Sequence, residues 1–252
     1  MIRSEVRERV ARVRFERLEK KNALTPQMYA QLGAALRAAE EDAAVRCVLL
    51  HGTADCFTAG NDVGDFLNLP RTAGATPAQA LFDVLPWMAK PVVAAVGGPA
   101  IGIGSTMLLH CDLVYAAPNA RFQLPFVPLG LVPEFGSSFL LPRLAGYQRA
   151  AELLLLGRPF TAQQAHEAGI VTEVVPQNEL IEHSLKIASS LAALPPESVR
   201  LTKKLMKARH APALGAAIEE ETRAFGERLV SPEAKEALSA FLEKRKPDFS
   251  RF

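Results

Sequence analysis

Short apolar strands that alternate with helical segments predict an α/β fold for this chain of 252 residues. Cys47 to Leu50 and Val92 to Val96 are apolar runs rich in β-branched side chains and bounded by Gly or Pro, as is typical of buried parallel strands. Asp112 to Ala116 has the same character, and helical pattern lies between and after these runs. We therefore expect parallel strands joined by right-handed crossovers, with ligands bound at loops beyond the strand C-termini.

The first part of the chain predicts one strand followed by a long helix. Apolar residues alternate with arginines over residues 6–15, which favours a strand with a solvated arginine face. Thr25-Pro26 then has the sequence of a helix N-cap with proline at the first helical position. We expect that helix to run to about Glu41.

The last quarter of the chain is predicted to be almost entirely helical. Beyond about Asn178 the composition changes to Ala, Leu, Lys and Glu with helical periodicity, broken only at Pro195-Pro196, Pro212 and Pro232. We therefore expect an α/β core over residues 1–195 and a helical C-terminal region over residues 196–252. Such a region packs on its own core or on a neighbouring subunit, and the sequence leaves both options open.

Composition excludes several classes of partner. Lys and Arg total 29 against 27 Asp and Glu, so the net charge of +2 gives no field that would favour nucleic acid or an anionic membrane. No run approaches the ~18 apolar residues of a membrane span, and the N-terminus lacks an apolar signal region, so we expect a cytoplasmic protein. The odd set of Cys47, Cys56 and Cys111 lacks metal-ligand spacing, which predicts buried thiols and no metal site.

Two Gly-rich segments lie at the ends of predicted strands. Phe57 to Asp62 suits either an ordinary turn or a tight turn that presents a backbone N–H group to a substrate oxygen. Val96 to Ser105 leads into a helical pattern over Thr106 to His110, so its free N–H groups lie at a helix N-terminus, where negative charge is favoured. The second segment lacks the Lys-Ser/Thr ending of a nucleotide-binding P-loop. Together the segments predict a site for an oxyanion.

Glu134 is a lone carboxylate among apolar and small residues just before a predicted helix. Its neighbours Leu131, Val132 and Phe135 should raise the pKa of this carboxyl group by desolvation, which makes it a better base toward carbon. The alternative is that Glu134 caps the helix that begins near Phe135.

Taken together, these residues resemble the crotonase, or enoyl-CoA hydratase/isomerase, superfamily from about Val10 to Lys246. Besides Phe57 to Asp62, the resemblance depends on Asn22-Ala23-Leu24, Lys90-Pro91-Val92-Val93-Ala94-Ala95-Val96 and Cys111-Asp112-Leu113-Val114-Tyr115-Ala116. It implies the crotonase (ClpP-like) spiral of ββα units with a helical C-terminal trimerisation region, in a homotrimer or homohexamer. It also implies an acyl-CoA substrate and no separate cofactor, because coenzyme A is part of the substrate.

The resemblance also implies catalytic residues. The oxyanion is held in this family by two backbone N–H groups, which here correspond to Asn61 and Ile103. Hydratases use two glutamates, and the matching positions hold Thr106 and Phe126, which cannot serve as acid and base. Pro133-Glu134 followed by Ser137-Ser138 looks like the Δ3-Δ2-enoyl-CoA isomerases of the peroxisomal type, in which the single catalytic glutamate matches Glu134. We therefore expect an enoyl-CoA isomerase of fatty acid β-oxidation.

Residues that hold the substrate are also implied by the resemblance. Ala59, Asn61, Asp62 and Ile103 belong to the two Gly-rich segments, and Asp62 is expected to order its turn by hydrogen bonding to the backbone. Further contacts to the nucleotide end of coenzyme A are expected from Arg17, Glu19 and Lys20 and from Lys244-Arg245-Lys246, where a solvated basic surface is the alternative. The segment Phe66 to Leu85 resembles the variable wall of the acyl pocket.

Two other functions stay open. One is a different acyl-CoA reaction on the same fold, such as decarboxylation, thioester hydrolysis or a hydratase-like step, with Glu134 reused. The other is a non-catalytic relative that binds acyl-CoA or RNA, although no aromatic residues interleave with basic ones to favour RNA. His51 and His110 lack a nucleophile or metal partner in the sequence and are expected to be structural.

Overall fold

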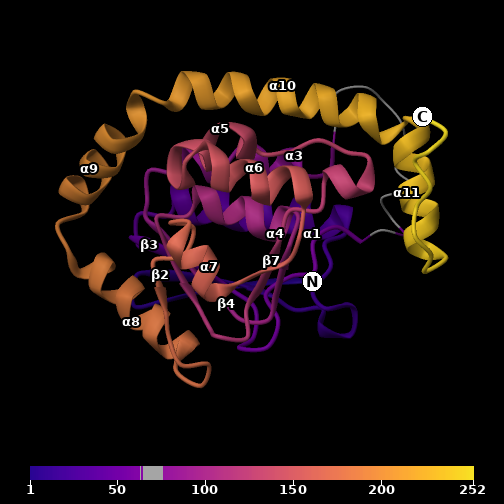
Figure 1. Ribbon diagram of the computed structural model, residues 1–252. Coiled ribbons are helices and arrows are strands. Elements are labelled where there is room, and N and C mark those ends of the chain that lie inside the picture. The colour runs from indigo at the N-terminus through magenta and orange to yellow at the C-terminus, as the bar shows by residue number, and fades with distance from the viewer. Residues whose placement is uncertain (63, 65–75) are drawn as a thin grey trace.

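A six-stranded sheet forms the centre of the described part of the chain, which in this computed structural model comprises residues 1–62, 64 and 76–252 (Figure 1). Its strands, in spatial order, are β1 (Ile2–Arg7), β2 (Val10–Phe15), β3 (Cys47–His51), β4 (Val92–Val96), β6 (Leu113–Ala116) and β9 (Glu173–Val174). The neighbours from β2 to β9 pair in parallel, and β1 pairs with β2 antiparallel. The three predicted parallel strands are therefore confirmed.

Beyond the large sheet, the chain continues into the strands of a second, smaller sheet. It consists of β5 (Pro99–Ile101), β7 (Arg121–Gln123) and β8 (Phe160–Thr161). Only Gly97 and Gly98 separate β4 from β5, and a Cβ atom on Gly98 would lie 1.8 Å from the carbonyl oxygen of Asp55. The chain therefore passes from the large sheet to the small one at glycines, where a side chain does not fit. Strands β4 and β5 are followed by a helix, which is the predicted unit of two strands and a helix.

The prediction of one strand over residues 6–15 is wrong, because β1 and β2 form a hairpin at this position. Glu8 and Arg9 occupy the turn with φ angles of 50° and 67°. Two-residue hairpin turns with both residues in the left-handed region usually contain Asn or Gly, and neither is present here. The alternating pattern therefore continued through the turn without a visible break.

The helices of the core follow or lie between these strands. The predicted helix is α1 (Pro26–Glu41), and the Thr25 side chain accepts a hydrogen bond from the backbone N–H of Met28 at 3.2 Å, as an N-cap should. The helical segment expected at residues 106–110 begins earlier, at Ile103. The others are η1 (Leu18–Lys20), α3 (Gln79–Phe82), η2 (Leu85–Trp87), α4 (Ile103–Thr106), η3 (Met107–His110), η4 (Val127–Leu129), α5 (Ser137–Ala145), α6 (Tyr147–Leu156) and α7 (Ala162–Glu167).

Four helices make up the last part of the chain, which confirms its predicted helical character. They are α8 (Leu180–Ala193), α9 (Pro196–Ala208), α10 (Ala211–Leu229) and α11 (Pro232–Leu242). The predicted proline breaks fall in the first turns of α9, α10 and α11. There a proline costs little, because the first N–H groups of a helix have no partner within the helix.

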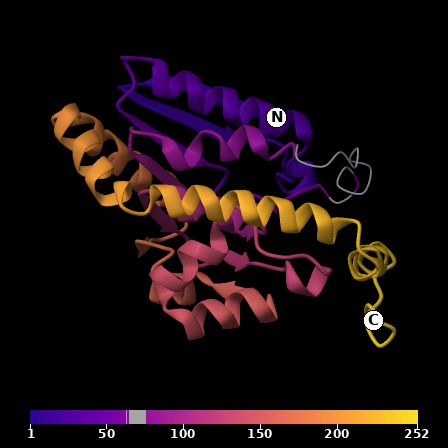
Figure 2. The same cartoon turned by 90° about the horizontal axis from the view of Figure 1, so that it is seen from above.

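Helix α10 packs on its own chain. In Figure 1 it runs above α5 and α6, and Figure 2 shows it crossing between α1 on one side and α5 and α6 on the other. Leu214, Ile218 and Phe225 of α10 belong to the main hydrophobic core. Helix α8 covers the opposite face of the large sheet, where Leu180 and Ala188 pack in a second cluster with Leu49 of β3.

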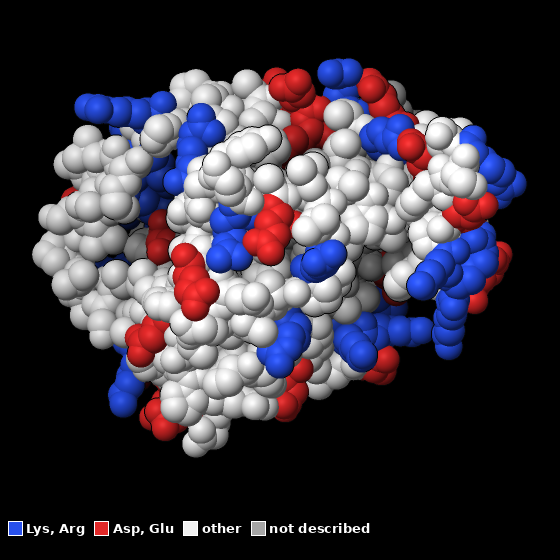
Figure 3. All heavy atoms as spheres, viewed as in Figure 1, with Lys and Arg blue, Asp and Glu red and all other residues white. Residues whose placement is uncertain are grey.

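Charged side chains of both signs are interspersed on the face shown in Figure 3, with broad uncharged areas between them. Among the described residues, no helix is long and apolar enough to cross a membrane.

Candidate active site

A cavity that is partly open to solvent lies beneath α10. Its wall combines α1, α3, the segment after β3, the loop before α5, and α10. The lining residues are mostly apolar: Leu24, Pro26, Tyr29, Asn61, Asp62, Thr76, Pro77, Ala78, Phe82, Glu134, Thr222, Phe225, Gly226 and Leu229. Of the predicted site residues, Asn61, Asp62 and Glu134 line it, and the described part of the expected pocket wall contributes Thr76, Pro77, Ala78 and Phe82. Ala59 and Ile103 are not among its lining residues, and residues 66–75 of the expected pocket wall lie outside the described residues.

The two Gly-rich segments lie side by side. Thr58 and Ala100 form a parallel bridge, in which the backbone N–H of Thr58 donates to Pro99 at 2.9 Å. A Cβ atom on Gly60 would lie 2.5 Å from the carbonyl oxygen of Ile101, so only glycine permits this approach.

The predicted oxyanion donors follow this bridge on both segments. Asn61 and Ile103 are each three residues beyond a bridged partner, and among the described residues neither backbone N–H donates to a protein acceptor. Ile103 is also the first residue of α4, where the helix dipole favours negative charge. A pair of unused N–H groups on adjacent segments is a suitable arrangement for binding an anionic oxygen.

The Asn22-Ala23-Leu24 motif fixes the first of these segments. The buried side-chain amide of Asn22 donates to the carbonyl oxygens of Cys56 and Phe57 at 3.2 and 2.9 Å. The hydroxyl of Thr58 donates back to the Asn22 carbonyl at 2.7 Å, and the N–H of Leu24 donates to Gly60 at 2.7 Å. These bonds hold the backbone around Gly60 in place beside the cavity.

Glu134 places a buried carboxyl group in the wall of the cavity. The residue is 6% exposed, and its Oε1 atom has no partner among the described residues. Burial, reinforced by the charge of Glu221, raises the pKa of Glu134 to about 8. The predicted direction of this shift and its physical cause therefore agree with the structure. A desolvated carboxylate of this kind is a stronger base than a solvated one.

The alternative that Glu134 caps the following helix is wrong, because another carboxylate does so. Glu221 of α10 accepts hydrogen bonds from the N–H groups of Gly136 at 2.5 Å and Ser138 at 2.8 Å, and from the Ser138 hydroxyl. Glu221 cannot be singled out from the sequence, because it follows two further glutamates in a helix and no neighbouring residue marks it. Its role depends on a contact across 85 positions in the chain.

Tyr29 is a second residue of the cavity that the sequence did not single out. Its buried hydroxyl donates to the side-chain oxygen of Asn61 at 2.5 Å. Burial, and then the nearby charge of Glu134, raise the pKa of Tyr29 well above its ordinary value, so the phenol stays protonated. In the sequence, Tyr29 is one of several inward-facing positions of an amphipathic helix and cannot be distinguished from a core residue.

Asp62 and Arg17 order the turn beside the cavity. One carboxylate oxygen of Asp62 accepts from the N–H of Gly64 at 3.1 Å, and the other contacts the Arg17 guanidinium at 2.7 Å. Arg17 also donates to the carbonyl oxygen of Ala23, so its guanidinium is engaged within the protein. Glu19 and Lys20 are exposed on η1, outside the cavity lining. Contacts from these two residues to coenzyme A stay a prediction.

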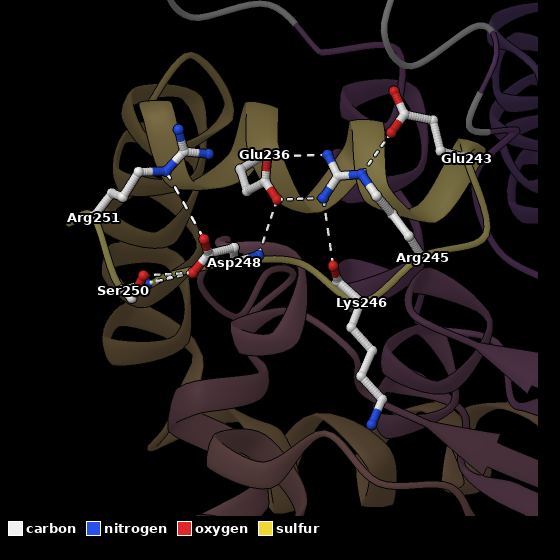
Figure 4. A network of polar contacts seen from close by, with 7 residues as sticks. All are labelled: Glu236, Glu243, Arg245, Lys246, Asp248, Ser250 and Arg251. Atoms are coloured by element: carbon white, nitrogen blue, oxygen red, sulfur yellow. Dashed lines mark hydrogen bonds and ion pairs between the residues drawn. The ribbon is translucent and has the colours of Figure 1, made fainter.

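The basic residues Lys244 to Lys246 lie just past α11. Figure 4 shows that Arg245 is part of a surface network, with its guanidinium 2.5 Å from a carboxylate oxygen of Glu236 and 2.5 Å from one of Glu243. The Lys246 side chain points away from this network. Of the three, Arg245 is therefore committed to carboxylates within its own chain, and a role of Lys244 and Lys246 toward phosphate stays a prediction.

Thr106 and Phe126, which the resemblance matches to the two hydratase glutamates, are buried. The ring of Phe126 packs against that of Phe225 at 6.4 Å, and the Thr106 hydroxyl has no partner among the described residues. His51 and His110 bond to the backbone carbonyls of Gly52 and Phe135 at 2.9 and 2.8 Å. Burial lowers the pKa of His110 to about 3, so it is neutral at ordinary pH.

Within the described residues, no group of three or more His, Cys, Asp or Glu side chains is placed to hold a metal ion.

By sequence and by structure, the chain is similar to enoyl-CoA hydratases and isomerases. The family model described as enoyl-CoA hydratase/isomerase matches residues 5–251. A 2,3-dehydroadipyl-CoA hydratase of Escherichia coli is 35% identical, covering 96% of this chain and 95% of that protein. Enoyl-CoA delta isomerase 2 of Rattus norvegicus is 36% identical over 94% of this chain and 62% of that protein. The crystal structure of an enoyl-CoA hydratase/isomerase from Pseudoalteromonas atlantica superimposes with a TM-score of 0.94 at 42% identity, covering 99% of both chains.

Proposed function

Because this chain belongs to the enoyl-CoA hydratase/isomerase family, we propose that it is an enoyl-CoA isomerase, which moves a 3,4 double bond of an acyl-CoA to the 2,3 position. The fold is the predicted crotonase fold, and the protein is an acyl-CoA enzyme. Its relatives include hydratases and isomerases at about 35% identity, so the choice between these reactions depends on the site.

The observation that carries the proposal is the buried carboxyl group of Glu134 in the cavity wall. Glu134 lines the cavity and is buried, and its Oε1 atom has no hydrogen-bonding partner in the part of the chain that the structure describes. Thr106 and Phe126 occupy the positions of the two hydratase glutamates and have no group that could activate water. One base is sufficient for isomerisation, because the proton that leaves one carbon can return to another.

The proposed reaction proceeds through an enolate. Glu134 removes a proton from C2, and the electron pair of that C–H bond moves toward the thioester carbonyl, whose oxygen becomes negatively charged. The backbone N–H groups of Asn61 and Ile103 stabilise this oxygen, and losing one such donor costs about 2.7–4 kcal/mol in a comparable site. The enolate then re-forms the thioester carbonyl, a double bond forms between C2 and C3, and the electron pair of the former 3,4 double bond takes the proton from Glu134 at C4.

The cavity wall supports this chemistry. Leu24, Phe82 and Phe225 offer an apolar surface to an acyl chain next to Glu134. An apolar wall also limits the water near the enolate, which favours return of the proton to the acyl chain over its loss to solvent.

Assembly into a homotrimer or homohexamer stays a prediction, to be checked by sedimentation equilibrium.

The test is to follow formation of the conjugated thioester from a 3-enoyl-CoA by absorbance. We expect conversion by the parent protein and a loss of about 10²–10⁴-fold in Glu134→Gln, because a positioned base contributes a factor of that size. Glu220→Gln, which changes an exposed glutamate of α10, is the matched control and should react like the parent.

Two results would reject the proposal. Equal rates for the parent and Glu134→Gln would exclude Glu134 as the base. Faster hydration of a 2-enoyl-CoA than isomerisation of the 3-enoyl-CoA by the parent would place the protein among the hydratases.

A further inference from the structure

The loop that carries Glu134 has an unusual backbone. Phe135 and Gly136 have φ angles of 60° and 71°, and a left-handed conformation at a phenylalanine costs energy. His110 contacts the carbonyl oxygen of Phe135 at 2.8 Å, and the Ser137 hydroxyl donates to that of Glu134 at 2.7 Å. Such a turn persists only when its surroundings hold it from several sides.

Glu221 of α10 stabilises the same turn from its other side. Its two carboxylate oxygens accept from the N–H groups of Gly136 and Ser138 at the start of α5. Glu134 is the acidic residue next to these donors in the sequence, yet its carboxylate makes no such bond. Because a carboxylate from α10 occupies the cap, the carboxylate of the loop is left available to the cavity.

Glu221 also brings a negative charge close to Glu134. Burial raises the pKa of Glu221 above its ordinary value, and hydrogen bonds from Ser138 and from the backbone of Gly136 act in the opposite direction by favouring its charged form. After burial, Glu221 is the largest cause of the raised pKa of Glu134.

The other ionisable groups around Glu134 contribute less. Tyr29 of α1 and His110 of η3 are neutral, and Asp62 on the cavity wall is paired with Arg17. Among the described residues, Glu221 is therefore the side chain whose charge raises the pKa of Glu134.

We propose that Glu221 is a positioning residue for Glu134: from α10 it caps α5, holds the left-handed turn at Phe135 and Gly136, and keeps a second negative charge beside the base. The inference rests on the proposed function in that Glu134 is taken to be the base. Its consequence is that the C-terminal helical region sets the basicity and the geometry of a residue in the α/β core.

Two variants separate the effect of the Glu221 charge from the effect of its hydrogen bonds to the start of α5. Glu221→Gln removes the charge and loses one acceptor oxygen, whereas Glu221→Asp retains the charge on a shorter side chain. In the parent, kcat/KM for a 3-enoyl-CoA should rise with pH as Glu134 loses its proton. In Glu221→Gln the midpoint of that rise should move down by about one pH unit, because a like charge has been removed. Glu221→Asp should keep the midpoint and lose about tenfold in kcat through the displaced loop.

A second measurement does not depend on turnover. The carboxyl group of Glu134 is titrated by infrared spectroscopy, with the spectrum of Glu134→Gln subtracted in each background. The same downward shift of the midpoint is expected in Glu221→Gln, and Glu220→Gln should titrate like the parent. Circular dichroism checks that each variant is folded.

The outcomes are distinct. An unshifted infrared midpoint in folded Glu221→Gln overturns the inference, whether or not the protein is an isomerase. A shifted midpoint in a parent protein without isomerase activity supports the coupling and rejects the proposed function alone. If Glu221→Gln does not fold, a parent-like kcat in Glu221→Asp overturns the inference, and a reduced kcat with an unchanged midpoint supports it.

Discussion

Two buried glutamates lie next to each other in this protein, one on the loop before α5 and one on α10, and they differ in their bonding. Glu134 is 6% exposed and Glu221 is 7% exposed, so burial does not distinguish them. Both oxygens of Glu221 accept hydrogen bonds, whereas Oε1 of Glu134 has no partner among the described residues. Buried polar groups are usually satisfied, so the missing partner identifies the residue that is available for chemistry.

The largest expected consequence of this difference is in the pH dependence of stability. The pKa of Glu134 is raised to about 8 in the folded protein from an ordinary 4.5, so the folded state holds a proton that the unfolded state has lost between those values. Stability should therefore fall as the pH rises from about 4.5 to about 8. Glu134→Gln has no such proton to lose. Above about pH 8, its free energy of unfolding should therefore exceed that of the parent by on the order of 3–5 kcal/mol.

Urea unfolding of the two proteins across this pH range measures the effect. The free energies of unfolding should be close at the acidic end and should diverge as the pH rises. Parallel curves would mean that Glu134 is solvated in the folded protein, and the contrast with Glu221 would then disappear.

The next largest effect is expected from the satisfied glutamate. Glu221→Ala leaves two backbone N–H groups and one hydroxyl without their acceptor at the start of α5, which should lower the free energy of unfolding by about 2–3 kcal/mol. Glu220→Ala, on the exposed side of the same helix, should change it by less than about 0.5 kcal/mol. Chemical denaturation at pH 7 compares them, and equal losses would contradict the capping role.

The smallest effect is expected at Tyr29, which resembles Glu221 because it is buried and hydrogen bonded. Tyr29→Phe keeps the ring and removes the bond to the Asn61 side chain. A bond of this kind contributes about 1.4 kcal/mol, so kcat should fall about tenfold with little change in KM. Steady-state isomerisation kinetics measure this, and an unchanged kcat would show that Asn61 is held by its backbone alone.

The elements of the fold that the sequence predicted have causes within a few residues. Thr25 and Pro26 begin α1, and Pro196 and Pro232 begin α9 and α11, because capping and the missing proline N–H act locally. The hairpin at Glu8 and Arg9 was missed for a related reason. Neither residue belongs to the small set that usually signals such a turn, and the conformation is imposed by the pairing of β1 with β2.

For the site, the local pattern around Glu134 was sufficient to predict its burial and its raised pKa. The two Gly-rich segments were predicted at strand ends, and they are adjacent because those strands are neighbours in one sheet. Tyr29, Phe225 and Glu221 could not be found in this way. Each acts through a contact between elements distant in the chain, and each looks in the sequence like an ordinary residue of an amphipathic helix.

Helix α10 closes the cavity with Thr222, Phe225 and Leu229, and it also carries Glu221. A premature stop codon anywhere before this helix would therefore remove part of the cavity wall and not just a peripheral segment. The truncated product would have an open pocket, an uncapped α5 and a base in altered surroundings, so attempts to engineer a minimal version of this enzyme have to retain the final quarter of the gene.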